Sequence, residues 1–204
     1  MAEFKVPEQK NLVFIGEAGS GKTETAVNLA LRMAREGGRR VHFFDMDQTK
    51  PLFRARDCEA QLEREGVVFH FQAQYLDAPT VASGVIETLR DEGSAVIMDI
   101  GGGSHGSHMI GQFSHLLNSA NTLVLYIVNP FRPWSGSCED IEVTMRRVLG
   151  AARLGSFRLV ANPNLGPETR AEDVLEGLRR FQGLFPGEEA LFACALEELV
   201  SKLA

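Results

Sequence analysis

The sequence predicts one α/β domain over residues 1–204, with a mostly parallel sheet of about seven strands and helices on both faces. Short apolar runs alternate with longer segments in which apolar residues recur at helical spacing. The apolar runs are nearly continuous, as in parallel strands that are buried on both faces. No repeat, low-complexity segment or long linker interrupts this pattern, and 204 residues suit a single substantial domain.

The strands are predicted where an apolar run meets a turn residue. Three glycines that begin at Gly101 follow the fourth run. Asn129-Pro130 and Asn162-Pro163 end the fifth and sixth runs, because asparagine before proline is an ordinary strand terminator. In chain order, the strands are expected at residues 11–15, 41–44, 67–71, 95–100, 122–128, 157–161 and 190–193.

The helices are predicted where apolar residues recur at intervals of three and four. Gly37 and Gly38 end the first helix, and Pro79 lies in the first turn of the third. In chain order, the helices are expected at residues 23–36, 51–65, 78–92, 109–118, 138–153, 171–181 and 196–203.

The turn after the first strand has the sequence GEAGSGKT, residues 16–23, and matches the phosphate-loop pattern GxxxxGK[ST] in full. Its glycines let the backbone curl so that successive amides point inward, and the following helix adds its positive N-terminal end. This context predicts a P-loop NTPase fold. The expected nucleotide-binding residues are Gly16, Ala18, Gly19, Ser20, Gly21, Lys22, Thr23 and Glu24.

Charged and hydroxyl side chains near this loop predict its chemistry. Lys22 is expected to reach the β- and γ-phosphates as a catalytic cation, and the Thr23 hydroxyl to ligate Mg²⁺. Asp45 and Asp47 follow the second apolar run and Asp99 ends the fourth, so all three should lie at the same sheet edge as the loop. Such carboxylates hold Mg²⁺ or its water shell, or orient an attacking water.

Composition argues against several classes of partner and of metal site. The net charge of −6 makes a nucleic-acid partner unexpected. No segment approaches the length of a membrane helix, and the N-terminus lacks a signal peptide's apolar core, so we expect a cytoplasmic protein without a membrane partner. The three cysteines are far apart and have no histidine at ligand spacing, which argues against a zinc or iron–sulfur site.

Residues 19–30 and 40–47, together with Asp99, resemble the MinD/ParA group of SIMIBI-class P-loop NTPases. The resemblance implies that Asp47 lies in a first switch and activates water, and that Asp45 lies near Mg²⁺. It places Asp99 in a second switch and Asn162 where relatives contact the base. Residues 162–165 do not form the guanine-selecting NKxD sequence, which favours ATP over GTP.

Glu17 departs from this group, whose members usually carry a lysine there that reaches the phosphates of a nucleotide-bridged partner. A carboxylate is repelled by a triphosphate, so we expect Glu17 to turn away or to pair with a basic side chain. This change weakens the expectation of a nucleotide-bridged dimer and of hydrolysis that depends on it.

Two further loops lie near the predicted site. Residues 101–108 contain three consecutive glycines and two histidines, and we expect them to form a flexible switch loop. Residues 129–135 carry Trp134, the only tryptophan, which either binds a partner or covers the end of the sheet.

The leading functional hypothesis is a slow, Mg²⁺-dependent ATPase that acts as a molecular switch. A protein partner or a second copy of the chain would control it. Two alternatives remain open at this point. One is a small-molecule kinase or ATP-driven synthetase of related fold, and the other is a nucleotide sensor that does not hydrolyse.

Overall fold

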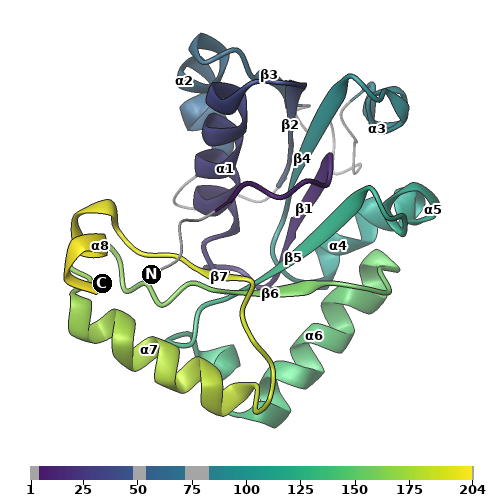
Figure 1. The fold of residues 1–204 in the computed structure, drawn as a ribbon. Coiled ribbons are helices and arrows are strands. Elements are labelled where there is room, and N and C mark those ends of the chain that lie inside the picture. The colour runs from purple at the N-terminus through teal and green to yellow at the C-terminus, as the bar shows by residue number, and fades with distance from the viewer. Residues whose placement is uncertain (1–4, 48–53, 72–82, 204) are drawn as a thin grey trace.

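A computed structural model describes residues 5–47, 54–71 and 83–203 (Figure 1). Seven strands form one sheet in the order β3-β2-β4-β1-β5-β6-β7, and each neighbouring pair is parallel. The predicted parallel α/β fold is therefore confirmed. The strands are β1 (Asn11–Ile15), β2 (Arg40–Met46), β3 (Val68–Phe71), β4 (Ser94–Ile100), β5 (Thr122–Val128), β6 (Arg158–Ala161) and β7 (Phe192–Ala193).

Helices cover both faces of this sheet, as Figure 1 shows. The α-helices are α1 (Lys22–Glu36), α2 (Glu59–Arg64), α3 (Val85–Arg90), α4 (Gly103–Ile110), α5 (Ser114–Leu117), α6 (Cys138–Ala152), α7 (Ala171–Leu184) and α8 (Glu197–Leu203). The described residues also form three short 3₁₀ segments, η1 (Ala55–Cys58), η2 (Gly111–Phe113) and η3 (Pro133–Ser135).

The alternating side chains of the strands divide the apolar interior into two cores. Leu12 and Phe14 of β1 face the core that α1 and α2 cover. Val13 and Ile15 face the other core, which α3, α4, α6 and α7 cover. Both faces of β1 and β4 are buried, which explains their uninterrupted apolar sequences.

The segment after β4 differs from its prediction. The expected flexible loop of residues 101–108 is largely the helix α4, which packs against α6, and the helix expected at 109–118 is split into the end of α4, η2 and α5. Glycine favours turns in isolation, but tertiary packing overrides this preference. A Cβ at Gly106 would lie 2.2 Å from Gly101 O, so the close return of the chain requires glycine there.

The other predicted elements agree with the structure to within a few residues at their ends. The expected helices at 51–65 and 78–92 extend into residues 51–53 and 78–82, which lie outside the described residues. Their described parts contain η1 with α2, and α3. No helix within the described ranges combines the length and apolar character that a membrane crossing requires.

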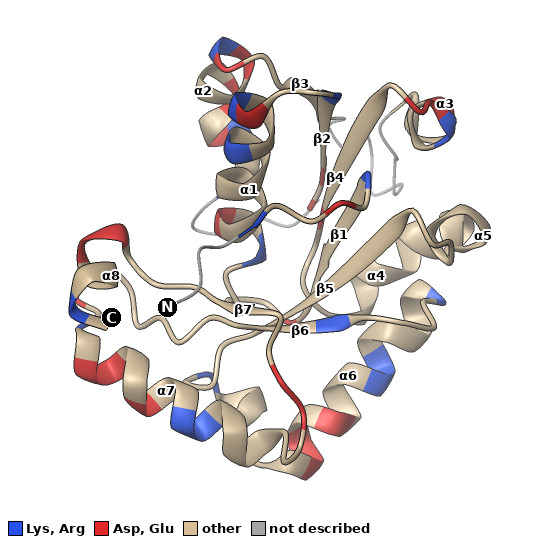
Figure 2. Cartoon of the chain, viewed as in Figure 1, with Lys and Arg blue, Asp and Glu red and all other residues tan. Residues whose placement is uncertain are grey.

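Both acidic and basic residues lie on the surface helices α6 and α7. Figure 2 shows the acidic residues of α6 and α7 in the N-terminal part of each helix and the basic residues after them, so neither helix presents a purely basic surface.

Candidate functional site

The phosphate loop, residues 16–23, joins β1 to α1 at the sheet edge where the parallel strands end. The predicted nucleotide-binding residues from Gly16 to Glu24 all lie in this loop or in the first turn of α1. Gly21 has a φ of 91°, and a Cβ there would lie 2.0 Å from Asn162 Nδ2, so only glycine fits. The helix start lacks a side-chain cap from the described residues, which leaves backbone N–H groups for an anion.

Lys22 lies buried beneath the loop, and its Nζ donates a hydrogen bond to Glu17 O at 2.9 Å. Burial lowers the pKa of Lys22, although the carboxylates of Asp99, Asp47 and Glu17 oppose the shift. The ammonium group is therefore held close to the loop backbone, where a phosphate would compensate its desolvation.

Asp99 is fully buried at the end of β4, and neither carboxylate oxygen has a hydrogen-bond partner among the described residues. Burial raises the pKa of Asp99 to about 7, although the neighbouring Thr23 hydroxyl and Lys22 ammonium partly oppose this. A buried carboxylate without partners is costly unless a cation binds it. Together with the Thr23 hydroxyl, Asp99 supplies the oxygen ligands that Mg²⁺ prefers, so these residues fit a magnesium site.

Asp45 is also buried, but both of its carboxylate oxygens accept hydrogen bonds. Its Oδ1 accepts from Asp47 N at 3.0 Å, and its Oδ2 accepts from Arg56 Nε at 3.0 Å. Arg56 also donates to Asp47 O at 2.5 Å and stacks over the Phe71 ring at 3.7 Å. Burial raises the pKa of Asp45 in spite of Arg56. The sequence did not indicate Arg56, because only the fold brings η1 back to the end of β2.

Asp47 lies directly after β2, and its carboxylate faces the segment after β4. A Cβ at Gly101 would lie 3.1 Å from Asp47 Oδ1, which shows how closely the two segments pack. The structure therefore brings Asp45, Asp47, Asp99 and the phosphate loop to one edge of the sheet.

Glu17 points away from the loop interior and pairs with Arg147 of α6. This agrees with the expectation that Glu17 turns away or finds a basic partner. The backbone carbonyl of the same residue accepts from Lys22 under the phosphate loop, whereas its side chain pairs with Arg147 of α6.

Asn162, expected to contact the base, and Asn129, at the end of the preceding strand, both have partners within the chain. The Asn162 side chain donates to Ser20 O at 2.7 Å and so braces the phosphate loop. Asn129 is buried, donates to Asn164 O at 2.7 Å and accepts from Phe131 N at 3.0 Å. Contact of Asn162 with a base stays a prediction, and the structure assigns Asn129 a role in holding its loop.

Arg132 and Trp134 contact the outside of the phosphate loop through side-chain hydrogen bonds to Gly19 O and Ala18 O. The sequence indicated an unusual Trp-containing loop but not its target. Its position after a strand end was the available signal, because carboxyl ends of parallel strands converge on one edge.

Comparison with known proteins agrees with this geometry. The model of the CobQ/CobB/MinD/ParA nucleotide-binding domain family matches residues 12–160. A search of curated proteins found no match.

Solved structures of FtsY proteins share the fold. The cell division protein FtsY from Thermotoga maritima aligns with a TM-score of 0.60 and 17% identity, over 96% of this chain and 65% of that one. Chloroplast FtsY from Physcomitrella patens aligns with a TM-score of 0.52 and 19% identity, over 78% and 52%. The signal recognition particle receptor FtsY from Elizabethkingia anophelis in complex with GDP gives 0.51 and 21%, over 78% and 50%. The chain thus spans only part of the length of these structures.

Proposed function

Because the chain belongs to the CobQ/CobB/MinD/ParA nucleotide-binding domain family, we propose that it binds ATP with Mg²⁺ and hydrolyses it slowly as a partner-controlled switch. The observation that carries this proposal is the buried carboxylate of Asp99, which has no partner among the described residues and lies beside Lys22 and Thr23 of the phosphate loop. A structural carboxylate would be paired, as Asp45 is.

Each residue has a distinct task in this proposal. The amides of residues 16–23 and the Lys22 ammonium hold the phosphates and neutralise their charge. Thr23 and Asp99 hold Mg²⁺, which would stabilise the charge that develops on the transferred phosphoryl group. Asp47 orients the attacking water and accepts its proton. Asp45, also expected near Mg²⁺, is paired with Arg56 and would have to release it to contact the metal site.

The choice of nucleotide rests on the segment after β6. Residues 162–165 lack the aspartate that pairs with guanine in NKxD sequences, which supports ATP. One of the similar structures contains GDP, so GTP is the competing ligand to test. Titration of the protein with each nucleotide and Mg²⁺ in a calorimeter measures the preference, and we expect tighter binding of ATP.

A small-molecule kinase or synthetase activity is the second candidate. The Glu17–Arg147 pair favours it, because Glu17 has an intrachain partner and is directed away from the phosphates, unlike a lysine that reaches across a nucleotide-bridged dimer. An enzyme of this kind needs an acceptor rather than a second subunit to complete its site.

Single-turnover hydrolysis tests the switch. Wild-type protein should convert bound ATP to ADP slowly. Asp47→Asn should bind ATP with nearly unchanged affinity, but its hydrolysis rate should be lower by at least about 100-fold. Equal rates in both proteins would remove Asp47 from the mechanism. Tight ATP binding without hydrolysis, with or without candidate partners and acceptors, would instead establish a nucleotide sensor.

A further inference from the structure

The loop between β5 and α6 lies against the outer side of the phosphate loop. Arg132 Nε donates to Gly19 O at 2.9 Å, and Trp134 Nε1 donates to Ala18 O at 3.3 Å. Two side chains from one short segment thus bind two consecutive carbonyl groups of the phosphate loop.

These carbonyls determine where the neighbouring amides point. A trans peptide unit is planar, and its C=O and N–H point in opposite directions. A bond that holds Ala18 O outward therefore turns Gly19 N–H inward. A bond to Gly19 O likewise fixes the direction of Ser20 N–H, which here donates to Glu17 O at 3.3 Å, the same carbonyl that accepts from Lys22 Nζ. A bound phosphate would take the place of Glu17 O as the acceptor for both groups. Inward amides are what a phosphate loop uses to bind phosphate oxygens.

We propose that Arg132 and Trp134 are positioning residues that pre-orient the Gly19 and Ser20 amides for the phosphates of the nucleotide. This inference rests on the proposed function, because it assigns no ligand other than the nucleotide. It adds two residues, more than 100 positions away in sequence, to the machinery of the loop.

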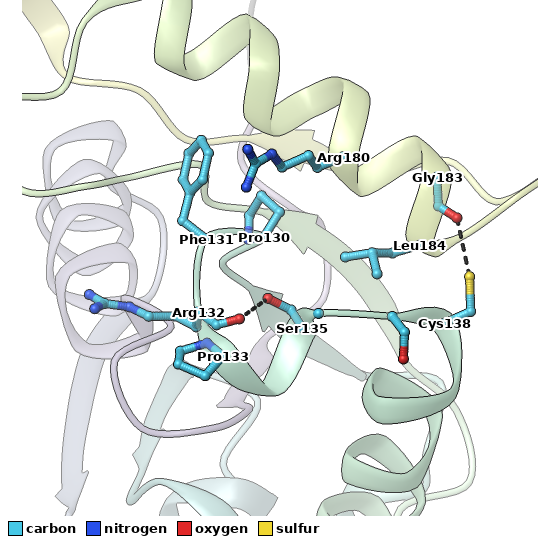
Figure 3. Close-up of a pocket in the computed structure, with 11 residues that line it drawn as sticks. Pro130, Phe131, Arg132, Pro133, Ser135, Cys138, Arg180, Gly183 and Leu184 are labelled. Carbon is cyan, nitrogen blue, oxygen red and sulfur yellow. Dashed lines mark hydrogen bonds between the residues drawn. The ribbon is translucent and has the colours of Figure 1, made fainter.

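The segment that carries both side chains is itself fixed. Ser135 is buried, and its Oγ lies 2.8 Å from Asn129 O and 2.7 Å from Arg132 O. Figure 3 shows Arg132 extending away from Cys138 and Leu184, while Phe131 lies near Arg180 on the other side of the segment. Arg132 lines the pocket of about 640 Å³, and its Nε donates out of it to Gly19 O of the phosphate loop.

The contact is also close enough to restrict Gly19. A Cβ at this position would lie 3.3 Å from Arg132 Nε, so a larger residue would push the guanidinium group away. Glycine at position 19 therefore serves the contact with Arg132 as well as the loop backbone.

Trp134 provides a direct spectroscopic signal, because it is the only tryptophan in the chain. Its indole N–H is bonded to the phosphate loop, so nucleotide binding should alter its fluorescence emission. The same change should be absent in Lys22→Met, in which the loop can no longer hold phosphates.

The experiment measures the Kd for ADP, ATP and AMP, each with Mg²⁺, in wild type, Arg132→Met, Arg132→Lys and Trp134→Phe. Arg146→Met is the matched control, because Arg146 is an exposed arginine that pairs only with Glu142 among the described residues. Trp134→Phe keeps an aromatic ring for packing and removes only the N–H donor. Circular dichroism spectra and thermal unfolding verify that each variant is folded.

We expect Arg132→Met to weaken ADP and ATP binding about tenfold and Trp134→Phe to weaken it severalfold, with Arg132→Lys in between and Arg146→Met unchanged. AMP, which lacks the β-phosphate, should be affected least. If the wild type binds nucleotide and every folded variant has a Kd within twofold of the wild-type Kd, this inference is overturned and the proposed function is not. No nucleotide binding by wild type would overturn the proposed function and this inference with it.

Discussion

Asp45 and Asp99 occupy equivalent places on adjacent strands, yet their surroundings differ. The register of β2 and β4 places the two residues directly opposite each other, and both are buried. Asp45 accepts hydrogen bonds from Arg56 and from the backbone of Asp47. Asp99 has no such partner among the described residues.

This difference distinguishes a structural carboxylate from a candidate ligand. Burial raises the pKa of both groups. Asp45 accepts hydrogen bonds from a cation and an amide, whereas the Lys22 ammonium and the Thr23 hydroxyl beside Asp99 only partly oppose its shift. The folded chain leaves the burial of Asp99 only partly compensated by Thr23 and Lys22, as expected where a metal and a phosphate complete the site. The two carboxylates should therefore respond differently to pH, mutation and magnesium.

The pH dependence of stability should show the largest difference. Asp99 has a pKa of about 7 in the folded chain, against about 3.9 when unfolded, so the folded state retains the proton in this interval. Its contribution to the free energy of unfolding is complete below pH 4 and is lost as the pH rises through 7, a change on the order of 4 kcal/mol. Urea denaturation of metal-free and nucleotide-free protein between pH 4 and 8 measures it.

Asp99→Asn provides the control for that experiment. The variant should lack this part of the pH dependence and should be more stable than wild type at pH 8. A wild-type profile that matches that of Asp99→Asn would show that Asp99 is ionised without cost.

Asp99→Asn should also reduce hydrolysis of Mg²⁺-ATP about 100-fold, because an amide holds Mg²⁺ much more weakly than a carboxylate. Asp45→Asn should reduce it less, since the carboxylate of Asp45 is already occupied by Arg56. Turnover at increasing Mg²⁺ concentration measures both effects. A greater loss in Asp45→Asn would reverse the roles assigned to the two residues.

Arg56→Met should destabilise the fold by about 2 kcal/mol at neutral pH, because it leaves Asp45 buried without its cationic partner. We place the loss below that of a fully buried pair, since the Arg56 side chain is 21% exposed. Chemical denaturation gives the value, and Asp45→Asn in the same background should restore part of the stability. An unchanged free energy of unfolding in Arg56→Met would mean that water compensates Asp45.

Glu17→Gln should have the smallest effect, a change of less than about 1 kcal/mol in the free energy of unfolding, because its partner Arg147 is largely exposed. Thermal unfolding with Glu142→Gln as a matched surface control measures it. A loss of several kcal/mol would show that the Glu17–Arg147 pair holds the phosphate loop in place.

The sequence predicts the strands and the phosphate loop well because both depend on local patterns. The apolar runs of β1 and β4 and the glycines around Lys22 are visible without knowledge of the fold. The side chains that contact the site residues could not be predicted in this way. Arg56, Arg132, Trp134 and Arg147 reach their targets only through the packing of distant segments.

The helix α4 is a segment in which local sequence preference gave a wrong prediction. Its glycines and histidines predict a flexible loop on local preference, whereas packing against α6 makes the segment helical. Gly106 is required by the close approach to Gly101 O, where the chain turns from β4 into α4.

Titration of Lys22→Met with Mg²⁺-ATP in a calorimeter decides whether residues 16–23 hold a nucleotide. Lys202→Met is the control, because it removes an exposed lysine of α8. Wild type and Lys202→Met should bind ATP with the same Kd, and Lys22→Met should bind it at least about 100-fold more weakly while it remains folded. An affinity of Lys22→Met within twofold of wild type would contradict a nucleotide site at this loop.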